Sequence, residues 1–240
     1  MSLNAKAVAG KQTNKKPTPV MEAGTYPARL VQVIDLGVQP QKAYQGKEKP
    51  PVQQISLTYE FTDEFLKDED GNDREDKPRW LSEMMPLHNL KADRAKSTKR
   101  YYALDPKEDA EGDFTRLLGA PVNIVVGEYT TAKGVQRNKV EDATPMRAKE
   151  AAKVPELVNE PTCFVLDEPD MDVFYSLPEF LQDLISSNLE YQGSALQEAL
   201  EGDKKAKEED PMDEPEDDED QKDEPELPDE EDEENEELPW

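Results

Sequence analysis

Strand-forming residues, alternating with polar residues in the clearest cases, occupy five stretches of the chain. The first stretch is Gly24–Gly37, and in the second, Val52–Phe61, the apolar residues fall on every other position. Arg79–Leu87, Pro121–Thr130 and Val135–Ala143 complete the set. Turn signals at 70–72 and 133–134 separate the second stretch from the third and the fourth from the fifth. We therefore predict five strands, with two hairpins among them.

The segment between the third and fourth strands has a different character. Lys91–Leu104 is helical or irregular, and Asp113–Leu118 is a short helical stretch that ends at Gly119. Three strands, a helical insertion and two further strands match the order of the oligonucleotide/oligosaccharide-binding (OB) barrel, a five-stranded Greek-key barrel. We expect a mainly β protein with this OB-like antiparallel barrel. Another small barrel or an open antiparallel sheet is the alternative.

One amphipathic helix is expected after the barrel. Met146–Glu160 is a linker with some helical character, and the residues that follow lead to a helix at Ser176–Glu190. Ser176 and Glu179 have the spacing of a capping box, with Pro178 in the first turn. The apolar face of this helix holds Leu177, Phe180, Leu181, Leu184 and Ile185. We expect this face to pack on the barrel; contact with a partner or a second protomer is the alternative.

Acidic residues are concentrated at the C-terminal end. The chain has 29 Lys and Arg against 56 Asp and Glu, a net charge of −27, yet residues 1–145 hold 22 of each sign. Glu201–Trp240 alone holds 23 acidic residues and 4 lysines, and it ends in Leu238, Pro239 and Trp240. A run of like charges repels itself and cannot bury apolar area, so we predict a disordered tail. Its apolar tip indicates capture by a partner, although a merely solubilising tail is the alternative.

Four regions follow from these patterns. They are a flexible arm at 1–20, a nucleic-acid-binding OB domain at 21–145, a linker with the packed helix at 146–195, and an acidic tail at 196–240.

Several kinds of chemistry lack the residues they need. A single cysteine, Cys163, excludes an intrachain disulfide and a cysteine-based zinc site, and a single histidine, His88, excludes a histidine-rich metal site. No glycine-rich phosphate loop is present, and 68–73 fails the EF-hand spacing. We expect no enzyme activity, metal or cofactor. The chain has no apolar run of membrane-span or signal-peptide type, so we expect a soluble cytoplasmic protein.

A surface for single-stranded nucleic acid needs cations that follow the phosphates and aromatic rings on which bases stack. Both types recur at 42–49, at Arg79 and Trp80, at 91–102 and on the last hairpin. The loops at 42–49 and 133 flank the binding face of an OB barrel. Aromatic core residues and a solvated charged face are the alternative interpretation. The predicted nucleic-acid-binding residues are Lys42, Tyr44, Lys47, Lys49, Trp80, Lys91, Arg94, Lys96, Lys99, Arg100, Tyr101, Tyr102, Tyr129, Lys133, Arg137 and Lys139.

The chain resembles single-stranded DNA-binding proteins of tailed bacteriophages. Its end, Glu236–Trp240, is similar to the acidic tail of the bacterial single-stranded DNA-binding proteins, with tryptophan in place of the usual phenylalanine. Gly24–Gly37 and Ile55–Phe61 are similar to the first two strands of the phage proteins, and Leu177–Gln182 with Gly193–Ser194 to the segment after their barrel. The insertion Lys91–Gly119 has no counterpart that we can align.

This resemblance implies sequence-independent coating of single-stranded DNA in replication, recombination and repair, within the host cytoplasm for a phage protein. It also implies that Leu238, Pro239 and Trp240 recruit a polymerase, helicase or recombinase, with the chain as monomer or dimer. From the charge split we expect the tail to compete with DNA for the same groove. The alternatives are an acidic nucleic-acid mimic or chaperone that binds basic proteins without binding DNA, and an enzyme with an unusual acidic site.

Overall fold

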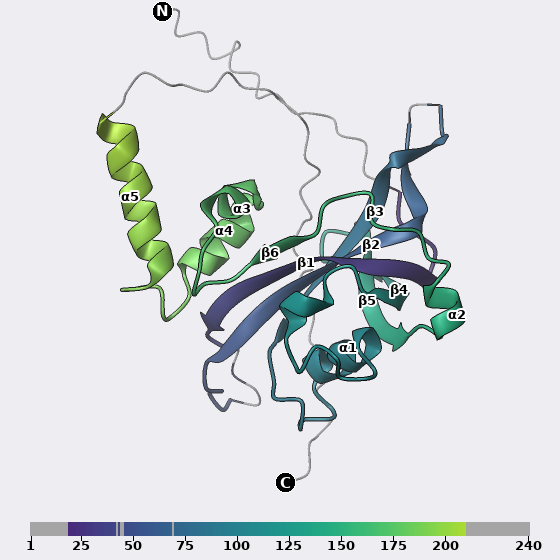
Figure 1. Cartoon of the computed structure of the whole chain (residues 1–240), viewed down its shortest axis with the longest axis horizontal. Helices are drawn as coiled ribbons and strands as arrows, with labels where there is room; N and C mark the ends of the chain where they lie inside the picture. The colour runs from purple at the N-terminus through teal and green to yellow at the C-terminus, as the bar shows by residue number, and fades with distance from the viewer. Residues whose placement is uncertain (1–18, 42, 44–45, 69, 210–240) are drawn as a thin grey trace, which may run out of the picture.

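An antiparallel sheet of long strands forms the body of the protein in the computed structural model, which describes residues 19–41, 43, 46–68 and 70–209. The strands β1 (Gly24–Gln39), β2 (Val52–Lys67), β3 (Asp73–Pro86), β4 (Pro121–Thr130) and β5 (Gln136–Pro145) follow one another in space as β3-β2-β1-β4-β5. Figure 1 shows this arrangement, with the β2–β3 hairpin projecting from the sheet. The mainly β architecture, the five predicted strands and both hairpins are confirmed.

Strand β1 is the centre of the sheet because it has three partners. It pairs with β2 from Ala28 onward and with β4 over Gly24–Arg29. Beyond Arg29, where the pairing with β4 stops, the short strand β6 (Thr162–Phe164) pairs in parallel with residues 32–34 of β1. An open edge would leave backbone groups of β1 without hydrogen bonds, and β6 satisfies them. The sequence did not predict β6.

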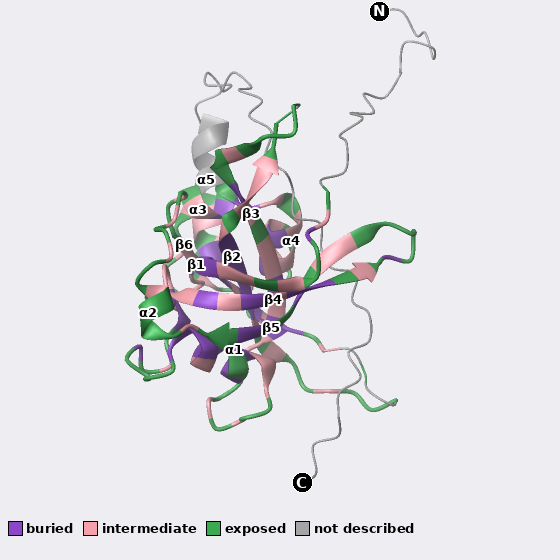
Figure 2. Cartoon of the chain, turned by 90° about the vertical axis from the view of Figure 1, so that its right-hand side faces the viewer, coloured by how far each residue is buried: buried purple, intermediate pink, exposed green. Residues whose placement is uncertain are grey.

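The main core lies on one face of these strands. Leu30, Leu57, Tyr59, Phe61 and Ile124 all point into it and are fully buried. Two helical elements cover one end, α1 (Lys96–Leu104) and the 3-10 helix η1 (Phe114–Leu117), through their own buried apolar side chains. Figure 2 shows that buried positions follow the strands, whereas exposed positions gather in loops and at hairpin ends.

The outermost strands of the path, β3 and β5, share no backbone pairing among the described residues. The sheet is therefore not closed by hydrogen bonds. The two strands nevertheless contact each other directly, and helix α1 packs against both of them. Side chains of α1 add to this contact where backbone pairing is absent.

A second, smaller core holds the C-terminal helices α3 (Met171–Ser176), α4 (Glu179–Ser186) and α5 (Ala195–Glu209) against the sheet, after the short α2 (Ala148–Ala151). Ile34 on β1 packs in it with Leu177, Leu181 and Ile185. Figure 1 shows these three helices at one end of the molecule. The apolar face predicted from the sequence is thus buried against the sheet.

The predicted single helix at 176–190 is wrong. Leu177 is extended, with φ −71° and ψ 150°, and separates α3 from α4. A residue before proline is disfavoured in the helical region, and Pro178 follows here. Ser176 consequently ends α3, and its hydroxyl donates to the carbonyl of Val173 rather than forming a capping box.

Other boundaries also differ from the prediction. Strand β2 continues past its predicted end at Phe61 to Lys67, and β3 begins at Asp73, before its predicted start at Arg79. A two-stranded ribbon is held by backbone pairing and needs no apolar alternation. Helix α5 occupies 195–209, the first part of the predicted disordered tail, and its Leu196 is buried in the second core. The remainder of that tail and the 1–18 arm lie outside the described residues.

Candidate nucleic-acid interface

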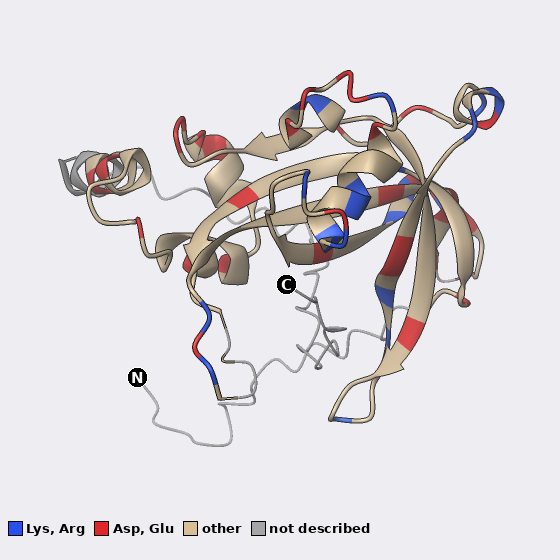
Figure 3. Cartoon of the chain, turned by 90° about the horizontal axis from the view of Figure 1, so that it is seen from below, with Lys and Arg blue, Asp and Glu red and all other residues tan. Residues whose placement is uncertain are grey.

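The predicted cationic residues lie on three separate segments of the structure. These are the loop between β1 and β2, the segment from Lys91 through α1, and the β4–β5 hairpin. Figure 3 shows Lys and Arg on all three, with Asp and Glu interspersed. The exposed members are Lys47, Lys91, Arg94, Lys99, Lys133 and Lys139, and the half-buried members are Lys49, Lys96, Tyr102, Tyr129 and Arg137. Lys42, Tyr44, Leu238, Pro239 and Trp240 lie outside the described residues.

Some of these cations form ion pairs with acidic neighbours. Lys96 Nζ lies 3.5 Å from Glu83 Oε2, and Lys139 Nζ lies 3.9 Å from Glu141 Oε1. Interactions within the protein also engage Lys49, Arg137 and Tyr129. Lys47, Lys91 and Lys133 are therefore better placed to meet a ligand than the more enclosed members of the set.

The structure corrects the prediction for Arg100 and Tyr101. Arg100 is 2% exposed and Tyr101 is fully buried, so neither side chain is available to a nucleic-acid strand. Their residue types suggested a binding surface, but both point from α1 toward the interior.

Arg100 instead links the two outer strands of the sheet. Its Nε donates to Glu83 Oε1 on β3 over 2.8 Å, and its Nη1 donates to Asp142 Oδ1 on β5 over 2.7 Å. The Tyr59 hydroxyl donates to the same Glu83 oxygen over 2.9 Å. This cluster joins β3 to β5 at the place where their backbones do not pair.

Protonation in this cluster follows from burial and charge. Burial raises the pKa of Tyr59 well above its ordinary value, and the Glu83 carboxylate raises it further, so the hydroxyl keeps its proton and donates. Desolvation lowers the pKa of Arg100, but Glu83 together with Tyr59 and Asp142 outweighs that effect and leaves the pKa raised. Arg100 therefore remains a cation inside the protein.

Tyr101 belongs to a second buried network at the end of α1. Its hydroxyl donates to Asp105 Oδ2 over 3.0 Å and accepts from the backbone N–H of Gly112 over 2.7 Å. The backbone N–H of Ala110 donates to the same Asp105 oxygen over 2.8 Å. These bonds fix the loop after α1, and this is a structural role.

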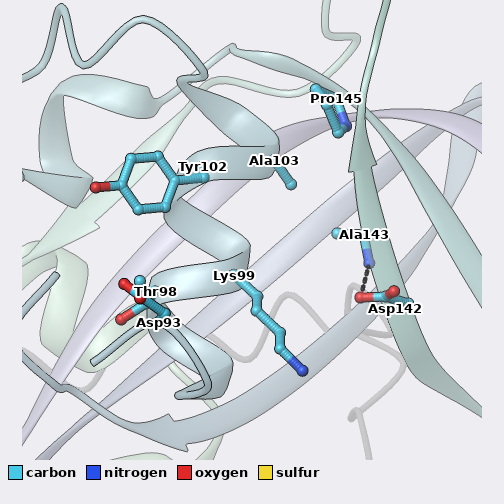
Figure 4. Close-up of a pocket in the computed structure, with 8 residues that line it drawn as sticks. All are labelled: Asp93, Thr98, Lys99, Tyr102, Ala103, Asp142, Ala143 and Pro145. Carbon is cyan, nitrogen blue, oxygen red and sulfur yellow. Dashed lines mark hydrogen bonds between the residues drawn. The ribbon is translucent and has the colours of Figure 1, made fainter. Parts of the chain in front are cut away.

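An open hollow of about 460 Å³ lies between α1 and β5. Lys99 and Tyr102 line it from α1, while Asp142, Ala143 and Pro145 line it from β5. Figure 4 shows the Lys99 side chain directed toward the Asp142 side and the Tyr102 ring directed the other way, so the hollow does not bring the ammonium group and the ring together. Asp93 and Asp142 also line the hollow and offset the charge of Lys99.

Trp80 is the predicted aromatic residue that the structure exposes most clearly. It lies on β3 with 45% of its surface exposed, on the face of the sheet opposite the main core. Across the strands it continues a row with Glu60 on β2 and Arg29 on β1. Its Nε1–H donates to Glu60 Oε2 over 3.0 Å.

Residues 154–160, here called the strap, cross the same face of the sheet. Arg29 Nε donates to the carbonyl of Pro155 over 2.7 Å, and its Nη2 donates to the carbonyl of Val154 over 3.0 Å. Glu60 accepts from the backbone N–H of Val158 over 2.6 Å and from the Asn159 side chain over 2.7 Å. The outer face of β1 and β2 is consequently covered, and the exposed ring of Trp80 lies beside the strap.

Sequence reasoning missed Glu60, Arg29 and Glu83. All three are buried, although an alternating strand pattern assigns Arg29 and Glu60 to the solvent face. The strap that covers Arg29 and Glu60 comes from a segment more than ninety residues away in the chain. No local sequence pattern indicates its path.

Comparisons with known protein families, curated proteins and solved structures found no match. No helix among the described residues is long and apolar enough to cross a membrane. The described residues also contain no group of three or more His, Cys, Asp or Glu arranged to hold a metal ion.

Proposed function

We propose that this protein binds single-stranded DNA without sequence preference, on an OB-type barrel. The strand path β3-β2-β1-β4-β5, with α1 inserted between β3 and β4, supports this fold assignment. The OB barrel is itself partly open, and it binds oligonucleotides on the face of its second and third strands and in the loops after strands one and four. The Arg100 link between β3 and β5 is compatible with such a barrel.

The observation that carries the proposal is the exposed Trp80 on the outer face of the β2–β3 pair. Lys47 lies in the loop after β1 and Lys133 in the loop after β4, and both side chains are exposed. An exposed aromatic ring can stack a base, and exposed cations in these two loops can neutralise phosphates, which are the two needs of a single strand. Lys99 at the α1–β5 hollow offers a further exposed cation.

The proposal includes a role in DNA replication, recombination and repair. In this role the acidic C-terminal segment recruits partner proteins through Leu238, Pro239 and Trp240. The charge of that segment supports this part of the proposal, since acidic tails serve as interaction tails. Removing the last three residues leaves DNA binding intact and abolishes partner recruitment if this assignment is correct.

A titration of the full chain with labelled oligo-dT at low salt tests DNA binding. In a Trp240→Phe background the remaining tryptophan, Trp80, reports stacking directly through quenching of its emission. We expect Trp80→Ala to weaken binding by about tenfold to a hundredfold, because one base–aromatic stack contributes about 1–3 kcal/mol. Tyr175→Ala, which removes a ring of similar exposure (44%) on α3, is the control and leaves binding unchanged.

Failure of the full chain to bind oligo-dT at low ionic strength refutes the proposal. Binding of a basic protein in the same assay without DNA binding would instead support the acidic mimic or chaperone.

A further inference from the structure

We infer that Glu60 is a positioning residue that holds the Trp80 ring in place as a stacking platform for an unpaired base. This inference rests on the proposed function. Glu60 is 1% exposed and cannot itself meet a ligand, but its Oε2 accepts the only polar hydrogen of the Trp80 side chain, over 3.0 Å.

The bond matters because a ring that is 45% exposed has less packing around it to fix its rotamer than a buried ring has. Rotation about the first side-chain torsion of Trp80 would carry Nε1 away from Glu60 and break the contact. A side chain that is immobile before binding loses less conformational freedom when a base stacks on it. The carboxylate therefore increases affinity without touching the DNA.

Glu60 can hold the ring because it is itself held from other sides. Its Oε1 accepts from Val158 N–H over 2.6 Å, and its Oε2 also accepts from Asn159 Nδ2 over 2.7 Å. In the sheet it is paired directly with Arg29 on β1 and with Trp80 on β3. One carboxylate thus joins the strap, β2 and the Trp80 ring into a rigid unit.

The same contacts indicate that the strap stays in place when a ligand binds. Lifting it would remove two of the three donors from the buried Glu60 and would also remove the Val154 and Pro155 carbonyls from Arg29. Leaving buried charged groups without partners is costly. The strap therefore forms a fixed wall beside Trp80, with the exposed Val158 at its surface.

A double-mutant cycle between Glu60 and Trp80 tests this inference. The full chain with Trp240→Phe is the reference, and affinity for labelled oligo-dT is read from fluorescence anisotropy. Glu60→Ala is expected to weaken binding by about twofold to tenfold, which corresponds to freezing one side chain. In the Trp80→Phe background, where the ring lacks the N–H, Glu60→Ala is expected to cause no further loss.

Asn159→Ala is the matched control. It removes a strap donor from the same carboxylate oxygen and leaves the indole contact intact, so the affinity should stay that of the reference. Time-resolved anisotropy of Trp80 in the DNA-free protein gives an independent measurement. The ring should gain fast local motion in Glu60→Ala but not in Asn159→Ala.

Equal losses from Glu60→Ala in both backgrounds, or an unchanged mobility of Trp80, would overturn the positioning role while DNA binding stands. Absence of binding by the reference chain would overturn the proposed function together with the stacking role. The two failures are therefore distinct.

Discussion

Replacing Arg100 by methionine is expected to destabilise the fold strongly, because it breaks a buried side-chain link between β3 and β5. The guanidinium makes two bonds to Glu83, of 2.8 and 3.3 Å, one to Asp142 and one to the carbonyl of Glu141. Methionine keeps the aliphatic stem but offers no donor. Glu83 would remain 5% exposed and would rely on the Lys96 ammonium, 3.5 Å away, to compensate its charge.

The size of the effect follows from what Glu83 retains. Removing one partner of a buried ion pair costs about 3–5 kcal/mol. The Tyr59 hydroxyl at 2.9 Å and the Lys96 ammonium at 3.5 Å still contact the carboxylate. We therefore expect a loss near the lower end, about 3 kcal/mol in the free energy of unfolding.

Urea denaturation at neutral pH, followed by far-UV circular dichroism, measures this loss. Arg116→Met is the matched control, because Arg116 pairs with Glu111 at the surface and such pairs contribute about 0–1 kcal/mol. Adding Glu83→Gln to Arg100→Met should restore about 1–2 kcal/mol, since it removes the orphaned charge and keeps an acceptor for Tyr59.

The reasoning is refuted if Arg100→Met loses no more stability than the control, or if Glu83→Gln adds a further loss in place of a recovery. A second readout concerns the interface. Because Arg100 is buried, the folded Arg100→Met protein should bind oligo-dT as tightly as the unmodified chain. A large loss of affinity in the folded variant would return Arg100 to the binding surface.

Three further predictions concern the pH dependence of stability, the packing around Gly37 and the salt dependence of DNA binding. The pKa of Asp105 lies below its usual value because hydrogen bonds, chiefly from Ala110 N–H, outweigh desolvation. Its contribution to the free energy of unfolding is therefore complete above about pH 4 and is lost as the pH falls through the lowered pKa. The loss of stability in Asp105→Asn, measured by urea denaturation, should be largest at neutral pH and should vanish in strong acid. Gly37→Ala should lower the free energy of unfolding by about 2–4 kcal/mol in the same assay, because φ is +73° and the new Cβ would lie 2.7 Å from Asn188. Gly193 has a similar φ of +78° but open space around it, so Gly193→Ala should lose only about 1–2 kcal/mol through backbone strain. Equal costs for the two glycines would exclude the packing contribution. Lys133→Ala should reduce the slope of log affinity for oligo-dT against log salt by about 0.7, and an unchanged slope would remove Lys133 from the interface.

The strands were predictable because each has its own local signal. Ile55, Leu57, Tyr59 and Phe61 alternate with polar residues, and all four are buried in the main core. Their order, with the helical insertion after the third strand, was predictable for the same reason. The side-chain link between β3 and β5 was not, because it depends on Arg100 meeting Glu83 and Asp142 from other segments, and a basic residue in a basic stretch gives no sign of burial.

The amphipathic helix shows how one local rule can override another. The spacing of Leu177, Leu181 and Ile185 correctly predicted which side chains pack on the sheet. The capping-box spacing of Ser176 and Glu179 predicted a helix start that does not form. Pro178 fits a first turn, but it also forces Leu177 out of the helical region, and in this chain the second effect sets the boundary.

The structure changes which of the predicted binding residues are available to a ligand. Composition predicted a binding segment at 91–102, yet two of its residues, Arg100 and Tyr101, are buried and hold the fold together. Trp80, a single aromatic residue in a strand, is the one that the structure exposes and orients. The difference arises because residue type indicates what a side chain could bind, whereas the buried partners Glu60 and Glu83 determine which side chains remain available. The oriented ring beside the strap is therefore a more specific basis for the binding hypothesis than the number of cations.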